Sequence, residues 1–210
     1  MQTPGLIFTV AILAACSTSA AAQTPPPAGQ PPQQGRGGGR GRGPVRVFTL
    51  ISSAFADGAP IPAVNAQPGH DVSPPLAWNG APDSTVSFVL AVHDADAATG
   101  NGTDDLLHWL VWNIPGTTTS LRAGVPQGAQ LADGARQISA TGPNYRGPAA
   151  PATGPAHHYV FELYALDAML EVPPVGAAPP VTRAAVMAAM GGHVRGKAVA
   201  VGFFRRAVSP

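Results

Sequence analysis

The stretch TDDLLHWLVWNIPG, residues 103–116, decides the fold. Between its acidic start and its Pro-Gly end, most positions hold leucine, valine, isoleucine or tryptophan. A run of this length that is rich in β-branched and aromatic residues and closes with a turn signal predicts a buried β-strand. The exception is His108, whose ionisable side chain needs a hydrogen-bond partner or a function at a buried position.

Four other segments have the same character and extend the prediction along the chain. They are VRVFTLIS (45–52), STVSFVLAVHDADA (84–97), PAHHYVFELYALD (155–167) and KAVAVGFFRR (197–206). Long Pro- and Gly-rich loops, at about 57–83 and 115–156, separate them. One helix is predicted at 183–190, with Thr182 as its N-cap and a Gly-Gly pair at its end. The chain therefore predicts a mainly β, largely antiparallel domain.

Period-2 alternation places three ionisable residues on apolar faces. Asp94 shares parity with Phe88, Leu90 and Val92. His108 shares parity with Leu106, Leu110, Trp112 and Ile114, and His157 with Tyr159, Phe161 and Leu163. If these strands are neighbours, one carboxylate and two imidazoles converge at the rim of the sheet.

Residues 1–22 are predicted to be a signal peptide. The apolar run 6–15 has the length of a signal-peptide core and is too short to span a bilayer. Cleavage before Cys16 is one interpretation, because LAAC resembles a bacterial lipobox, and ordinary cleavage near Ala22 is the other. We therefore expect an exported, periplasmic protein, which in the first case is anchored to the membrane by a lipid on Cys16.

Residues 23–43 are predicted to be a disordered Pro/Gln/Gly/Arg linker, and 44–210 the folded domain. Cys16 is the single cysteine, so the domain has no disulfide. Charged residues make up 11% of the chain and the net charge is +1, which argues against an extended basic surface for nucleic acid.

Four motifs carry a resemblance to a known family. They are DVSPPLAW (71–78), HDADA (93–97), HWLVWNIP (108–115) and GPNYRGPAAPATGPAHHYVFELYALD (142–167). In order and spacing they resemble the phosphatidylethanolamine-binding protein family, in particular its bacterial Raf-kinase-inhibitor-like branch. The resemblance implies a large central antiparallel sheet packed against a smaller one, with a C-terminal helix. It also implies a small pocket at one end of the sheet for phosphate-like anions or phospholipid head groups.

The motifs imply a ligand-binding set that contains the three residues found by parity. This set is Asp94, His108, Tyr145, Gly147, Pro148, His157 and Tyr159. Backbone N–H groups near Gly147 are expected to approach the anion, because glycine has no Cβ. The sequence departs from the family pattern where alanines replace prolines at 95, 98 and 150 and where His158 replaces an arginine.

These features predict a binding protein for a small anionic or phosphorylated ligand, with no catalytic residue and no cofactor assigned. Modulation of a protein partner is a further possibility, but the sequence identifies no partner. Two alternatives stay open. Two His and one carboxylate also form metal sites, and a histidine base could serve a hydrolase. For the hydrolase, only Ser73 is available as a nucleophile, in a context typical of a turn.

Overall fold

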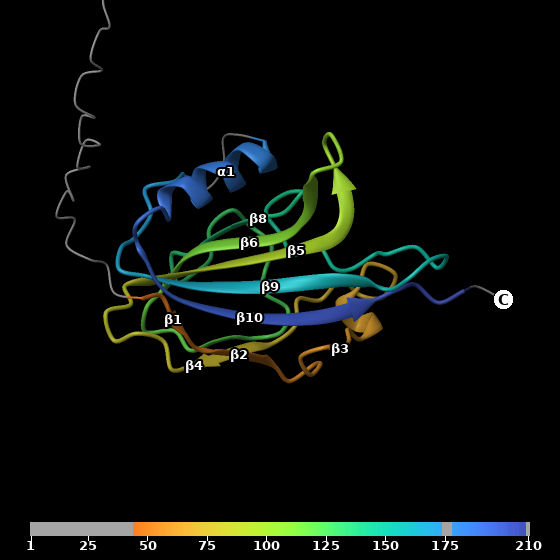
Figure 1. Ribbon diagram of the computed structural model, residues 1–210, viewed down its shortest axis with the longest axis horizontal. Helices are drawn as coiled ribbons and strands as arrows, with labels where there is room; N and C mark the ends of the chain where they lie inside the picture. The colour runs from red at the N-terminus through yellow and green to blue at the C-terminus, as the bar shows by residue number, and fades with distance from the viewer. Residues whose placement is uncertain (1–43, 174–177, 209–210) are drawn as a thin grey trace, which may run out of the picture. The chain divides into compact units, whose positions relative to one another are not determined.

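The computed structural model describes residues 44–173 and 178–208 and contains two β-sheets and one α-helix (Figure 1). Residues of the predicted leader and linker lie outside the described part of the chain. The large sheet has the strand order β1-β10-β9-β5-β6-β8, with β3 paired to β10, and the small sheet has the order β2-β4-β7.

The large sheet consists of β1 Arg46–Val47, β3 Ala59–Pro60, β5 Ser87–Thr99, β6 Asp104–Pro115, β8 Arg136–Ile138, β9 His157–Leu166 and β10 Val194–Phe204. The small sheet consists of β2 Thr49–Ser52, β4 Leu76–Asn79 and β7 Ser120–Leu121. A 3₁₀ turn, η1, spans Ala63–Asn65, and helix α1 spans Pro179–Ala189.

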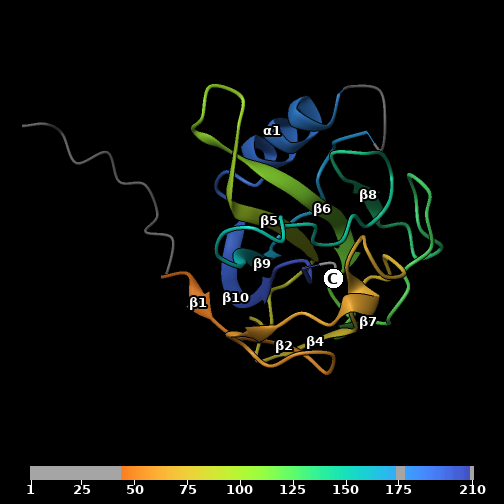
Figure 2. The ribbon, with the colours of Figure 1, turned by 90° about the vertical axis from the view of Figure 1, so that its right-hand side faces the viewer.

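The large sheet lies between two covering layers, α1 on one face and the small sheet on the other (Figure 2). Each face has its own apolar core. The small-sheet core includes Leu76, Trp78, Phe88, Trp109 and Phe161. The helix-side core includes Val89, Leu110, Trp112, Val186 and Met190. Because both faces are covered, the central strands are apolar on both sides, which explains the near-continuous hydrophobic runs in the sequence.

The predicted fold class is confirmed, with two local differences. The segment VRVFTLIS divides at Phe48, where the chain leaves β1 in the large sheet and enters β2 in the small one. The strands β1 and β3 pair with β10 in parallel, whereas the other pairs are antiparallel. Both parallel strands are only two residues long and pair with β10 alone, so the large sheet remains essentially antiparallel.

The predicted start of the helix is wrong. Helix α1 begins at Pro179, and Thr182 is a buried residue inside it. Pro179 and Pro180 occupy the first two helical positions, where a missing N–H costs nothing because helix N–H groups have no partner there. The predicted end is confirmed, since the helix stops before Gly191 and Gly192, and Gly192 has a φ of +87°.

Irregular pairing between β5 and β6 shifts the alternation of side chains. Val92 lies opposite Trp109, but His93 lies opposite Leu107, so His108 has no residue opposite it. A second shift lies near Asn113, which has a φ of +59° and exchanges two hydrogen bonds with the backbone of Leu170. Such bulges turn successive side chains toward the same face.

Candidate functional site

The strands that carry the predicted residues are neighbours, in the order β9-β5-β6. Asp94 lies where the pairing of β5 with β9 ends, His157 is the first residue of β9, and His108 is the fifth residue of β6. Antiparallel strands bring these positions to the same end of the sheet, and Asp94 lies directly opposite Tyr159. The expected convergence of one acid and two imidazoles at the rim is therefore correct.

Asp94 is a buried carboxylate whose oxygens are held by three donors. Its Oδ2 accepts a hydrogen bond from Nδ1 of His157 at 2.8 Å. Its Oδ1 accepts from the backbone N–H groups of Asp96 and Ala97, at 3.0 and 3.2 Å. In the neutral ring the proton is therefore on Nδ1, and Nε2 carries a lone pair. Protonation of the ring would turn Nε2 into a donor, while Nδ1 stays bonded to the carboxylate of Asp94.

His108 is only 1% exposed and leaves one ring nitrogen open. Its Nδ1 lies 2.7 Å from the backbone oxygen of Arg146, and since a carbonyl can only accept, Nδ1 donates. Its Nε2 is buried without a hydrogen-bond partner. Burial lowers the pKa of His108, against the weaker opposing effects of the Arg146 carbonyl and the Asp94 charge. The ring is thus neutral at pH 7, and Nε2 is an unsatisfied acceptor.

The parity argument selected His108 for the wrong reason. Leu110 and Trp112 belong to the helix-side core, whereas the His108 ring meets the ring of Tyr159 edge-on, with centroids 5.0 Å apart. Tyr159 belongs to the small-sheet core. The bulge at His108 turns the imidazole to the same face as Asp94 and His157. Simple alternation was correct for those two residues because β9 and this part of β5 pair without interruption.

The turn at 145–148 is fastened to the η1 loop. Gly147 donates its N–H to Oδ1 of Asp71 at 2.5 Å, and Pro148 accepts from the N–H of Gln67 at 3.0 Å. A Cβ on Gly147 would collide with the carbonyl oxygen of Asn65. The glycine is therefore required for close packing of two loops. Of the N–H groups near Gly147 that were expected to approach an anion, that of Gly147 itself is already accepted by Asp71.

The two tyrosines of the predicted set are hydrogen-bonded within the protein. Tyr145 donates its hydroxyl to the backbone oxygen of Asn65 at 2.9 Å, and burial raises its pKa well above the usual value. The hydroxyl oxygen of Tyr159 accepts from the N–H groups of Ala149 and Ala150, both at 3.2 Å. Burial raises the pKa of Tyr159 to about 12. These contacts leave the imidazole Nε2 atoms and the hydroxyl hydrogen of Tyr159 as the open polar groups of the set.

Two further acidic residues support the site, and neither is in the ligand-binding set predicted from the sequence. Asp71 holds Gly147 and has a φ of +55°. Its position at the head of the DVSPPLAW motif was the available signal. Asp96 accepts from the N–H and Nδ1 of His158, at 2.6 and 2.8 Å, and the backbone bond is the main cause of its lowered pKa. The His158 ring also meets Phe203, at 4.6 Å between centroids.

Neither alternative chemistry gains support. Within 44–173 and 178–208, no group of three or more His, Cys, Asp or Glu side chains is arranged to hold a metal ion. The hydroxyl of Ser73 accepts the N–H of Val125 at 2.8 Å, and Ser73 is 2% exposed. Ser73 is therefore a turn residue, as its context indicated.

The fold defines a class of two-sheet β proteins with one covering helix. The family model described as "Phosphatidylethanolamine-binding protein" matches residues 51–205. The chain belongs to the phosphatidylethanolamine-binding protein family.

No helix within the described residues is both long and apolar enough to cross a membrane.

Relatives and solved structures agree with this assignment. A UPF0098 protein of Methanothermobacter thermautotrophicus is 39% identical over 159 residues, which cover 75% of this chain and 98% of that protein. LppC of Mycobacterium tuberculosis, named as a candidate lipoprotein, is 36% identical over 68% of this chain and 67% of its own length. The crystal structure of the homologue CT736 from Chlamydia trachomatis has a TM-score of 0.63 and 30% identity, covering 77% of this chain and 99% of that one.

Proposed function

We propose that this family member binds a small phosphorylated ligand between His108 and His157. The observation that carries the proposal is the buried Nε2 of His108, which has no partner although unsatisfied buried polar atoms are costly. A ligand that reaches this nitrogen would remove that cost. The charge of Asp94 acts on His108 as well as binding His157, so the three side chains form one electrostatic unit.

The hydrogen positions of the two rings suggest which form of the ligand binds. Neutral His108 accepts at Nε2, so it requires a donor from the ligand. His157, held by Asp94, donates from Nε2 when protonated. A singly protonated phosphate monoester offers one P–OH to His108 and anionic oxygens to His157. Because the second pKa of a phosphate monoester is about 6, binding is expected to strengthen as the pH falls from 7.5 toward 6.

Calorimetric titration of phosphorylethanolamine into the metal-stripped protein tests this function. His108→Ala and His157→Ala should each abolish measurable binding, whereas His70→Ala should bind like the wild type, because His70 is an exposed loop histidine. Absence of binding by the wild type would overturn the proposal. Binding that both site variants retain would place the ligand elsewhere.

Export and lipid anchoring are part of the same proposal. They rest on the LAAC sequence that ends at Cys16 and on the name of the relative LppC. Mass spectrometry of the protein from bacterial membranes should find Cys16 as a lipidated N-terminal residue, and Cys16→Ser should release the protein from the membrane fraction. An unmodified N-terminus at Gln23 would show ordinary cleavage instead.

A further inference from the structure

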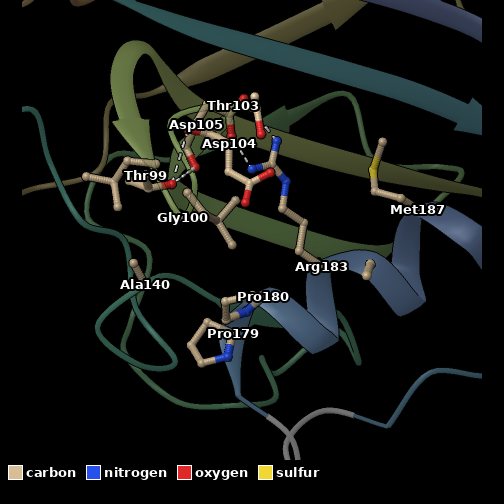
Figure 3. Close-up of a pocket in the computed structure, with 13 residues that line it drawn as sticks. Thr99, Gly100, Thr103, Asp104, Asp105, Ala140, Pro179, Pro180, Arg183 and Met187 are labelled. Atoms are coloured by element: carbon tan, nitrogen blue, oxygen red, sulfur yellow. Dashed lines mark hydrogen bonds and ion pairs between the residues drawn. The ribbon is translucent and has the colours of Figure 1, made fainter. Parts of the chain in front are cut away.

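A cavity of about 680 Å³ lies between helix α1 and the end of the β5–β6 hairpin (Figure 3). We name it the hairpin cavity. It is lined by Thr99, Gly100, Thr103, Asp104, Asp105, Leu106, Leu107, Ala140, Pro179, Pro180, Arg183, Ala184 and Met187. Its volume falls in the range of small-molecule sites. None of its lining residues belongs to the proposed phosphate site, and Leu107 packs in the core on the opposite, helix-covered face of the sheet.

The walls and the rim of the hairpin cavity differ in chemistry. Leucine, alanine, proline and methionine side chains from β6, α1 and the loop at Ala140 supply apolar walls, while the hairpin end supplies threonines and aspartates (Figure 3). An apolar chamber with a few polar groups at one end is the usual design of a site for a small amphiphilic molecule.

The one cation that lines the cavity already has a partner. Both terminal nitrogens of Arg183 contact the carboxylate of Asp105, from α1 to β6. Nδ1 of His93 lies 2.6 Å from the same carboxylate. By contrast, Asp104 lines the cavity as an exposed residue and has no side-chain hydrogen bond or ion pair with the described residues. The uncompensated charge of the lining is therefore negative.

The start of α1 offers nothing to an anion. Pro179 and Pro180 have no N–H, and the N–H groups of Val181 and Thr182 both donate to the backbone oxygen of Ala178, at 2.9 and 3.1 Å. The donors that make helix N-termini attractive to anions are thus missing or occupied. Thr99 Oγ1 uses its hydrogen on the backbone oxygens of Asp104 and Asp105, which leaves its lone pairs to accept.

We propose that the hairpin cavity is a second ligand site, which takes a small organic cation with an apolar body. The ammonium group lies at Asp104 and Thr99, and the apolar body lies against Pro179, Ala184 and Met187. Gly100 shapes this end, because a Cβ there would lie 2.5 Å from Oδ2 of Asp104. The site is independent of the proposed phosphate function, since it lies on the other face of the sheet.

The Met187 methyl group is a direct reporter, because the chain contains only four methionines. Protein with ¹³C-labelled methionine methyls would be titrated with 2-phenylethylamine, with 2-phenylethanol as the neutral probe and with 3-phenylpropionate as the anionic one. We expect the amine to shift the Met187 signal saturably and to bind more tightly than the other two. Asp104→Asn should weaken amine binding about two- to fivefold, as expected for one exposed charge.

Two matched variants place the ligand. Ala184→Phe fills the cavity and should abolish the shift, whereas Ala185→Phe, an exposed alanine outside the lining, should retain it. Unchanged Met169 and Met190 signals show that each variant is folded. An unsaturable Met187 shift, or retention of binding in Ala184→Phe, would overturn the site. Equal or tighter binding of the alcohol or the carboxylate would overturn the cation assignment.

Discussion

His93 and Asp94 are adjacent on β5 and begin two different kinds of ionisable cluster. On the helix side, His93 contacts Asp105 and Glu162 at 2.6 and 3.6 Å. Arg183 and Lys197 extend this row from α1 to β10. On the small-sheet side, Asp94 binds His157, and the neighbouring His108 keeps an open nitrogen. The residue types are similar, and in both clusters buried ring nitrogens lack a hydrogen bond. Both nitrogens of His93, however, lie beside carboxylates, whereas Nε2 of His108 has neither a hydrogen bond nor an ion pair.

The two clusters therefore have different roles: the charges on the helix side hold strands and helix together, whereas those around Asp94 are available to a ligand. In the helix-side row each carboxylate faces a cation, so the row joins α1, β6, β5, β9 and β10 and needs no ligand. In the site, the polar atoms are arranged around a missing partner. Burial of polar groups thus does not identify a binding site. A buried polar atom with neither a hydrogen bond nor an opposite charge beside it, in a cluster of ionisable groups, is the stronger indication.

The largest expected effect is loss of the Asp94 carboxylate. Asp94→Ala would leave three partly buried donors without an acceptor, so the free energy of unfolding should fall by about 3–5 kcal/mol. Urea denaturation followed by circular dichroism measures this. A change below about 1 kcal/mol would show that Asp94 is only a ligand contact. Asp83→Ala, at an exposed carboxylate, is the control.

Glu162 tests the helix-side row by pH. The His93 ring is the main cause that lowers the pKa of Glu162 to about 2, from a usual 4.5, and Lys197 adds to it against the effect of burial. Because the pKa of Glu162 is lower in the folded than in the unfolded state, its ionised form stabilises the fold at pH values above the unfolded-state pKa. This stabilisation is lost as the pH falls through the folded-state pKa. Glu162→Gln should therefore cost about 1–3 kcal/mol at pH 7, and the difference from wild type should shrink between pH 4.5 and 2. Phosphorylethanolamine binding should not change.

His108→Phe should show the opposite behaviour to Glu162→Gln. The substitution removes an unsatisfied buried acceptor and keeps an aromatic ring, but it also leaves the Arg146 oxygen without its donor. These effects offset each other, so the free energy of unfolding should change by less than about 1 kcal/mol. Ligand binding should nevertheless be lost. A large loss of stability instead would make His108 a structural residue.

The smallest effect is expected from restoring the family arginine in His158→Arg. The His158 side chain is half exposed and is hydrogen-bonded to Asp96, on the outside of the site. An exposed ion pair contributes roughly 0–1 kcal/mol, so stability should hardly change. Affinity for phosphorylethanolamine should rise no more than about threefold. A tenfold rise would show that this position faces the ligand.

The sequence was sufficient for the strands and for much of the site, for identifiable reasons. Asp94 and His157 lie in regularly paired segments, so alternation placed them correctly. The orientation of His108 depends on a bulge, which arises from pairing with β5 and has no signal in the residues of β6 alone. Asp71 and Gly147 are 76 positions apart, so their bond depends on how two loops pack. The hairpin cavity depends on where α1 rests, which no local pattern specifies.

The regular alternation of β6 between its two bulges also has an optical consequence. The chain contains three tryptophans, and β6 carries two of them on opposite faces of the large sheet. Trp109 packs edge-on against Tyr145 in the turn beside the phosphate site, with ring centroids 5.5 Å apart. Trp112 lies under α1 and donates its indole N–H to Val172 at 3.1 Å. In a variant that keeps Trp109 as its single tryptophan, the fluorescence would report on the ligand side of the sheet. In a variant that keeps Trp112 alone, it would report on the helix side.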